Sequence, residues 1–147
     1  FFADSFLTPF TAFLTTLGVV IAAWGGVMLA DIALRHKDYD EPSLFTPSGR
    51  YGSVNWGAVA SLVVGSLVGW GLVVNASASW LSWQGYLLGP LGGREGDWAG
   101  ANIGILLAMV VGFGGYWATS AGRVRAQEKL ASRTYAQGAE GAEEGEQ

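Results

Sequence analysis

The apolar positions of this chain form three long stretches without a charged residue, at 5–30, 54–74 and 98–122. A helix rises about 1.5 Å per residue and the apolar core of a bilayer is roughly 30 Å thick, so each stretch is long enough to cross a membrane. Polar and apolar residues do not alternate here as they would in the strands of a barrel. The pattern predicts an all-α integral membrane protein with transmembrane helices at about 6–33, 54–75 and 98–121.

Composition agrees with membrane embedding. Half of the 147 residues are hydrophobic and only 14% are charged, which is too little polar surface for a water-soluble domain of this size. The net charge of −4 says little about a partner, because many of the acidic residues lie beyond the last apolar stretch. The chain has no cysteine, which excludes disulfides and thiolate chemistry. Since the chain begins Phe-Phe-Ala-Asp, we expect a fragment whose upstream part is missing, although a trimmed terminus would look the same.

The basic residues predict the orientation of the helices. Three of them lie between the first two apolar stretches, one lies between the second and third, and four follow the third. The positive-inside rule therefore places the 34–53 loop and the carboxyl terminus in the cytoplasm and the 76–97 loop outside. Residues 80–91 are apolar but too short to span, so we expect an interfacial segment. Residues 1–125 are then the transmembrane region, and residues 126–147 are expected to be an acidic, disordered tail.

Small residues within the apolar stretches predict close helix packing. Gly65 and Gly69, and likewise Gly100 and Gly104, have the four-residue spacing that places two glycines on one face of a helix. Ordinary packing is the favoured interpretation, and a sliding or bending helix is the alternative. Two tryptophans lie well inside the predicted spans, and we expect them to pack against other helices: Trp24 and Trp70.

Pro9 gives the first predicted helix a site at which it could bend. Proline lacks a backbone donor, and the threonines at 8, 11, 15 and 16 could satisfy the freed carbonyls. The alternative is that Pro9 lies in the first turn, where proline is tolerated, and that the threonines bond to the preceding turn of their own helix.

Few side chains carry recognisable chemistry. Asp31 and Arg35 stand one helical turn apart, which favours a structural ion pair at the inner end over a proton or ion ligand. Ser53 or Asn55 could cap the second helix. The only histidine, His36, lies among charged residues. Because no catalytic set, phosphate-binding loop or metal-ligand spacing occurs, we expect no enzyme activity, catalytic residue, cofactor or metal site.

Three segments carry a family resemblance. They are Gly-Val-Met-Leu-Ala-Asp-Ile-Ala-Leu-Arg at 26–35, Tyr39-Asp40 followed by Leu44-Phe45, and Val-Asn-Trp-Gly-Ala-Val-Ala at 54–60. In this order they resemble the nucleobase:cation symporter family of cytosine, purine, allantoin and hydantoin permeases, from the tenth of about twelve helices into the eleventh. Two departures are Ile32, where members often carry Tyr, and Ala23, where many carry Pro.

The resemblance implies a secondary transporter with two inverted five-helix repeats and two further helices, of which this chain would supply the last three. Its substrate and its coupling ion, Na+ or H+, would bind outside this segment. The first helix would be the gating helix, with gate residues in its outer half: Phe10, Phe13, Leu14, Thr15, Thr16 and Leu17.

The resemblance also predicts what the chain does and where. The chain is expected to be the carboxyl-terminal fragment of a cation-coupled, multi-pass nucleobase permease of the plasma membrane. Its expected partners are the lipid bilayer, the upstream helices and a small nucleobase-like substrate, and not nucleic acid. The alternative is a small, complete three-helix membrane subunit or assembly protein.

Overall fold

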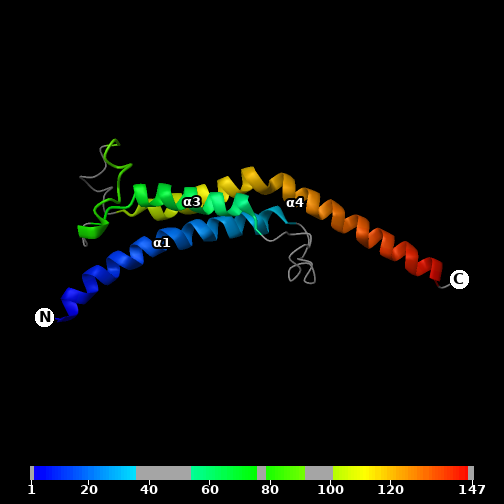
Figure 1. Cartoon of the computed structure of the whole chain (residues 1–147), viewed down its shortest axis with the longest axis horizontal. Helices are drawn as coiled ribbons and strands as arrows, with labels where there is room; N and C mark the ends of the chain where they lie inside the picture. Colours follow the sequence, from blue (N-terminus) through cyan, green and yellow to red (C-terminus); the bar gives the residue numbers. More distant parts are fainter. Residues whose placement is uncertain (1, 36–53, 76–78, 92–100, 146–147) are drawn as a thin grey trace.

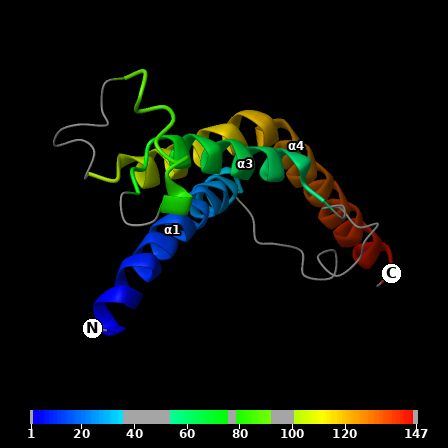
Figure 2. The ribbon, with the colours of Figure 1, turned by 60° about the vertical axis from the view of Figure 1, so that its left-hand side comes forward.

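Three long helices lie side by side in the computed structural model, which describes residues 2–35, 54–75, 79–91 and 101–145. They are α1 (Phe2–Leu34), α3 (Trp56–Gly71) and α4 (Ile103–Gly145), and a short 3-10 helix, η1 (Ser79–Leu81), precedes α4 (Figures 1 and 2). The helix α4 contacts both α1 and α3, most extensively α1. Within the described ranges the chain has helices and no strand, as predicted. The predicted loop beyond Arg35, together with Ser53 and Gly100, lies outside these ranges.

Two of the helices are long and apolar enough to cross a membrane, over Phe6–Leu34 and Ile103–Leu130. The third, α3, has 16 residues and is therefore only about 24 Å long. It ends at Gly71, four residues before the predicted end. The reason is that the carbonyls of Trp70 and Gly71 accept from the amides of Gly85 and Leu87, each at 2.9 Å, so the chain can leave the helix without unpaired carbonyls.

The boundaries of α4 also differ from the prediction. It begins at Ile103 rather than 98, after Asn102, whose φ of 47° is a left-handed conformation that asparagine tolerates. It continues to Gly145, through the stretch that was expected to be a disordered tail. Apolar patterning stops near Gly122, but the residues that follow are mostly good helix formers such as Ala, Glu, Gln, Arg and Lys, and no proline follows Pro90.

Glycines bring the three backbones into contact. A Cβ atom on Gly65 would lie 2.9 Å from the carbonyl oxygen of Ala108, and one on Gly69 would lie 2.9 Å from that of Gly104. Real Cβ atoms do not approach a backbone so closely, so the packing role predicted for Gly65 and Gly69 is confirmed. Two apolar clusters fill the remaining space between the helices: Val19, Ala23, Val73 and Ala108, and Val27, Ala30, Leu34, Tyr116 and Val124.

Residues 79–91, here called the cap segment, fold back onto α1 and α3. Leu81 is buried against Ala12, and Gln84 is also buried. Gly85 has a φ of 75°, which favours glycine, and it makes the turn that places the two amides described above against the end of α3. The cap segment is therefore part of the packed structure, held by backbone hydrogen bonds.

Candidate functional site

Thr16 joins α1 to both α3 and the cap segment. Its hydroxyl donates to the carbonyl of Ala12 at 2.9 Å and accepts from the Gln84 amide at 3.0 Å. Its own carbonyl accepts from the Trp70 indole at 3.0 Å. Among the predicted gate residues, Thr16 is thus the one with hydrogen bonds to α3 and the cap segment. The bond from Trp70 also confirms the packing role predicted for this tryptophan.

Asn75 and Trp83 complete this contact, here called the cap cluster together with Thr16, Trp70 and Gln84. The Asn75 amide donates to the carbonyl of Ala12 at 3.0 Å, and the ring of Trp83 meets that of Trp70 edge to face, with centroids 5.7 Å apart. Sequence reasoning missed Asn75 and Gln84. The available signal was that each is an amide side chain in an otherwise apolar stretch, where a polar group needs a partner.

The other predicted gate residues are exposed, apart from the half-buried Thr15. Thr15 bonds only within its helix, to the carbonyl of Thr11 at 3.0 Å. Pro9 lies well inside α1 rather than in its first turn, whereas the predicted bonds to the preceding turn are confirmed for Thr15 and Thr16. The exposed apolar side chains recur every three or four residues and form what we call the α1 stripe: Phe6, Phe10, Phe13, Leu17, Ile21, Trp24 and Met28.

The α1 stripe includes large aromatic side chains that are about half exposed. Trp24 is 55% exposed and Phe13 is 51% exposed, so packing of Trp24 against other helices stays a prediction. Leu14, on the edge of the same surface, is 47% exposed. An apolar surface of this length marks a contact with lipid or with further apolar helices.

The opposite end of the bundle carries a polar network around Asp31. One carboxylate oxygen accepts from the Nε of Arg35 at 2.9 Å, and the other accepts from the hydroxyl of Tyr116 at 2.5 Å. Asp31 and Arg35 are 17% and 12% exposed. The predicted structural pair is confirmed, and Tyr116 is buried in the network.

Asn55 extends the Asp31 network to α3. Its amide donates to the Tyr116 hydroxyl at 3.2 Å, and its side-chain oxygen accepts from the amide of Ala58 at 3.3 Å, which confirms the predicted helix cap. The same oxygen accepts from Arg123 at 3.1 Å. On α4, Gln127 accepts from Arg35 at 3.3 Å. The network therefore ties all three helices together at one end, as the cap cluster ties α1 and α3 at the other.

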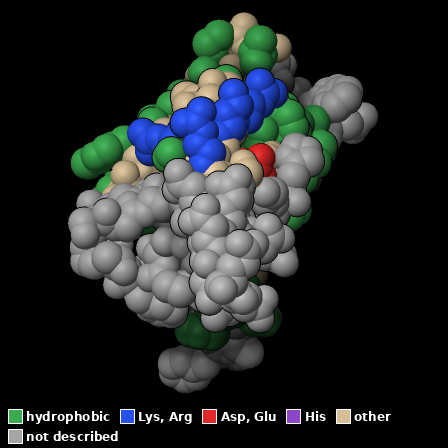
Figure 3. Space-filling model, turned by 90° about the vertical axis from the view of Figure 1, so that its right-hand side faces the viewer, with side chains coloured by type: hydrophobic (Ala, Val, Ile, Leu, Met, Phe, Trp, Pro, Cys, Tyr) green, Lys and Arg blue, Asp and Glu red, His purple; other side chains and the backbone are tan. Residues whose placement is uncertain are grey.

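Basic side chains gather on α4 beyond the Asp31 network. Figure 3 shows them on the face seen from the carboxyl-terminal end of α4, and the exposed basic residues there are Arg123, Arg125, Lys129 and Arg133. Arg125, Lys129 and Arg133 follow each other at one-turn intervals and so share one side of the helix. The cations begin where the apolar stretch of α4 ends.

Two helices long and apolar enough to span a membrane, joined to α3 by polar contacts at both ends and with cations grouped beyond one end, are typical of a helical membrane protein. Comparison with known protein families identifies the family. The sequence model of the family described as permease for cytosine/purines, uracil, thiamine, allantoin matches residues 2–89, which is more than half of the chain. The chain belongs to this permease family. The match covers α1, α3 and most of the cap segment. Comparisons with curated proteins and with solved structures gave no match.

Proposed function

We propose that this chain supplies the last three helices of a cation-coupled permease for a nucleobase-like heterocycle, with α1 as its gating helix. The observation that carries the proposal is the two-sided character of α1. One side is buried against α3, α4 and the cap segment, while the other presents the α1 stripe. A helix that closes over a substrate needs an exposed apolar side that faces the rest of the transporter. Most of the predicted gate residues lie on this exposed side of α1.

The two end contacts give α1 a support against which it can move. The Asp31 network holds its inner end to α3 and α4, while the cap cluster holds Thr16 and the carbonyl of Ala12 in its outer half. The turns before Ala12 have only exposed side chains from Phe6 to Thr11. Movement of this outer portion would open or close a path for the substrate. The substrate and the coupling ion, Na+ or H+, would bind to helices outside this chain, near the midplane.

Transport tests the gate assignment through Thr16. The chain is joined to the upstream helices of a family permease, and uptake of labelled cytosine, uracil and hypoxanthine by intact cells is measured. Thr16→Val keeps the shape of the side chain but removes its bond to Gln84. A hydrogen bond contributes about 1 kcal/mol, so we expect uptake to fall about fivefold.

Thr15→Val is the matched control, because Thr15 bonds only to the carbonyl of Thr11 in its own helix. We expect its uptake to equal that of the parent fusion. Equal uptake by both variants, at equal amounts of protein in the membrane, would contradict the gate role of Thr16. A parent fusion that reaches the membrane and transports none of the three bases would contradict the permease proposal itself.

The proposed orientation in the plasma membrane, with a cytoplasmic carboxyl terminus, is open to chemical labelling. The chain has no cysteine of its own, and Ser82 in the cap segment and Ser132 on α4 are both exposed. We expect a membrane-impermeant maleimide to label Ser82→Cys in intact cells and Ser132→Cys only after permeabilisation, because the basic end of α4 stays in the cytoplasm. The reverse labelling pattern would invert the topology.

A further inference from the structure

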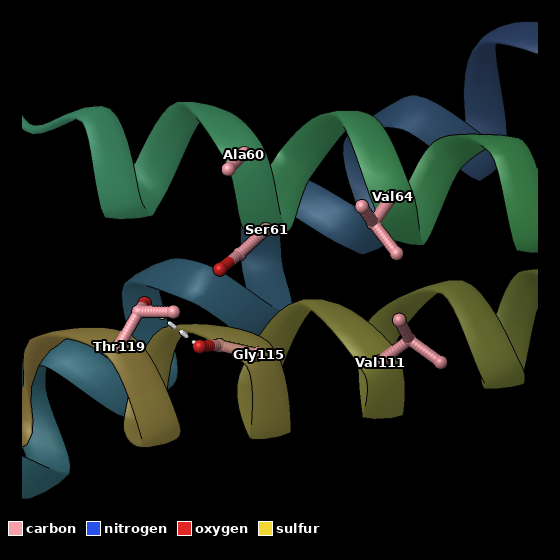
Figure 4. A pocket seen from close by; sticks show the side chains of 6 residues that line it. All are labelled: Ala60, Ser61, Val64, Val111, Gly115 and Thr119. Carbon is pink, nitrogen blue, oxygen red and sulfur yellow. Dashed lines mark hydrogen bonds between the residues drawn. The ribbon is translucent and has the colours of Figure 1, made fainter.

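An apolar groove runs between α3 and α4. Its volume is about 160 Å³, and α3 lines it with Ala60, Ser61 and Val64 while α4 lines it with Val111, Gly115 and Thr119 (Figure 4). The two hydroxyl groups bond within their own helices: Ser61 donates to the carbonyl of Gly57 at 2.7 Å and Thr119 donates to that of Gly115 at 2.8 Å. Both hydroxyl hydrogens are therefore already used, and the surface of the groove is almost entirely apolar.

One end of the groove leads to a cation. Val111, Gly115 and Thr119 are spaced one turn apart on α4, and the next residue in this series is Arg123, which is exposed. Arg123 donates one hydrogen bond, to Asn55. A guanidinium has five N–H donors, so this bond orients the side chain and leaves donors for a second partner.

The distance along α4 from Val111, at one end of the groove, to Arg123 is close to the thickness of one leaflet. Twelve residues separate Val111 from Arg123, which corresponds to about 18 Å of helix. Half of the hydrocarbon core is roughly 15 Å. If Val111 lies near the midplane, Arg123 lies at the level of the phospholipid headgroups, and Arg125, Lys129 and Arg133 follow on the aqueous side (Figure 3).

We propose that the α3–α4 groove binds one anionic phospholipid, with an acyl chain along the groove and the headgroup phosphate at Arg123. Charge complementarity selects this occupant, because an apolar trough that ends in a cation matches a molecule with a hydrocarbon chain and an anionic head. A bound lipid would fill the seam between α3 and α4 beside the Asp31 network. The proposal rests on the membrane location argued above and is independent of transport.

Retention of lipid by the purified chain tests this site. The whole chain in mild detergent is mixed with phosphatidylglycerol or with phosphatidylcholine of the same acyl composition, and bound lipid is counted by native mass spectrometry. We expect phosphatidylglycerol to be retained in preference to phosphatidylcholine. Arg123→Gln should lower phosphatidylglycerol retention about fivefold, the equivalent of about 1 kcal/mol for one basic side chain, and leave phosphatidylcholine unchanged. Ala60→Leu, which fills the groove, should lower retention of both lipids.

Two matched variants separate this site from general effects. Arg133→Gln removes the same charge further along α4, and Ala118→Leu adds the same bulk at an exposed position outside the groove. Both should retain lipid as the parent chain does. Equal losses in Arg123→Gln and Arg133→Gln, or parental retention in Ala60→Leu, would overturn the proposal. So would cross-linking of Ala60→Cys to another transmembrane helix in native membranes. Uptake by the fusion is scored separately, so failure of transport and failure of lipid binding remain distinguishable.

Discussion

Replacing Gly26 with alanine is expected to separate α1 from α4 and to lower the free energy of unfolding by about 3 kcal/mol, the upper end of the range for overpacking. The added Cβ atom would lie 2.1 Å from the carbonyl oxygen of Met109, 2.9 Å from its carbonyl carbon and 3.0 Å from the amide nitrogen of Phe113. All three are backbone atoms, so no side-chain rotation relieves the clash and the two helices must move apart. Unfolding in dodecyl maltoside by increasing mole fractions of dodecyl sulfate measures the loss.

The neighbouring residue provides the control for this variant. A Cβ atom on Gly25 would meet nothing within 4 Å. Since alanine is the better helix former by about 1 kcal/mol, Gly25→Ala should leave stability unchanged or raise it by up to that amount. Equal destabilisation by the two substitutions would show that helix packing at Gly26 does not hold α1 to α4.

Much of the fold follows from local pattern in the sequence. Charge-free stretches located the helices, the four-residue spacing of Gly65 and Gly69 predicted their contact face, and the four-residue spacing of Asp31 and Arg35 predicted their ion pair. Each of these features depends on residues within one or two helical turns. Helix geometry alone then determines which side chains meet.

What could not be predicted depends on partners far along the chain. The end of α3 is determined by the amides of Gly85 and Leu87, and Asp31 receives Tyr116 from 85 residues away. Nothing in the local sequence around Gly71 or Asp31 specifies these partners. The helical extension of α4 was missed for a different reason. Hydrophobic periodicity reveals a helix only where one face is buried, and a solvated stretch of strong helix formers has no such face.

The predicted gate residues are neighbours in the sequence, but the helix places them on different sides of α1. Thr16 and Phe13 are three positions apart, but Thr16 faces Gln84 and Phe13 lies on the α1 stripe. From the sequence, the gate could be predicted only as an interval of α1, because the family resemblance did not say which neighbours each side chain contacts. The structure separates that interval into Thr16, which is held by α3 and the cap segment, and the residues that are exposed on the outer side of α1.

Asp31→Ala is expected to have an effect at least as large as Gly26→Ala, at the other contact that holds α1. Removing the carboxylate takes one ion-pair contact, at 2.9 Å, from Arg35, which is only 12% exposed, and takes the acceptor from the Tyr116 hydroxyl. Breaking a buried pair from one side costs about 3–5 kcal/mol, because the remaining charge keeps its desolvation penalty. The same dodecyl sulfate titration measures the loss. Tyr116→Phe removes the hydrogen bond to the carboxylate and the one from the Asn55 amide, and loss of the first, to a charged group, should alone cost about 1.5–3 kcal/mol.

The double variant Asp31→Asn, Arg35→Gln decides whether the uncompensated charge is the cause. It removes both charges and keeps polar side chains of similar shape, so it should be more stable than Asp31→Ala by about 2 kcal/mol or more, since neutral pairs avoid most of the desolvation penalty. Arg125→Gln removes an exposed charge on α4 outside the network and should change stability by less than about 0.5 kcal/mol. If the double variant were as unstable as Asp31→Ala, the ion pair would not be the contact that stabilises α1 at this end. The bond from Tyr116 to the carboxylate would then be the contact that matters.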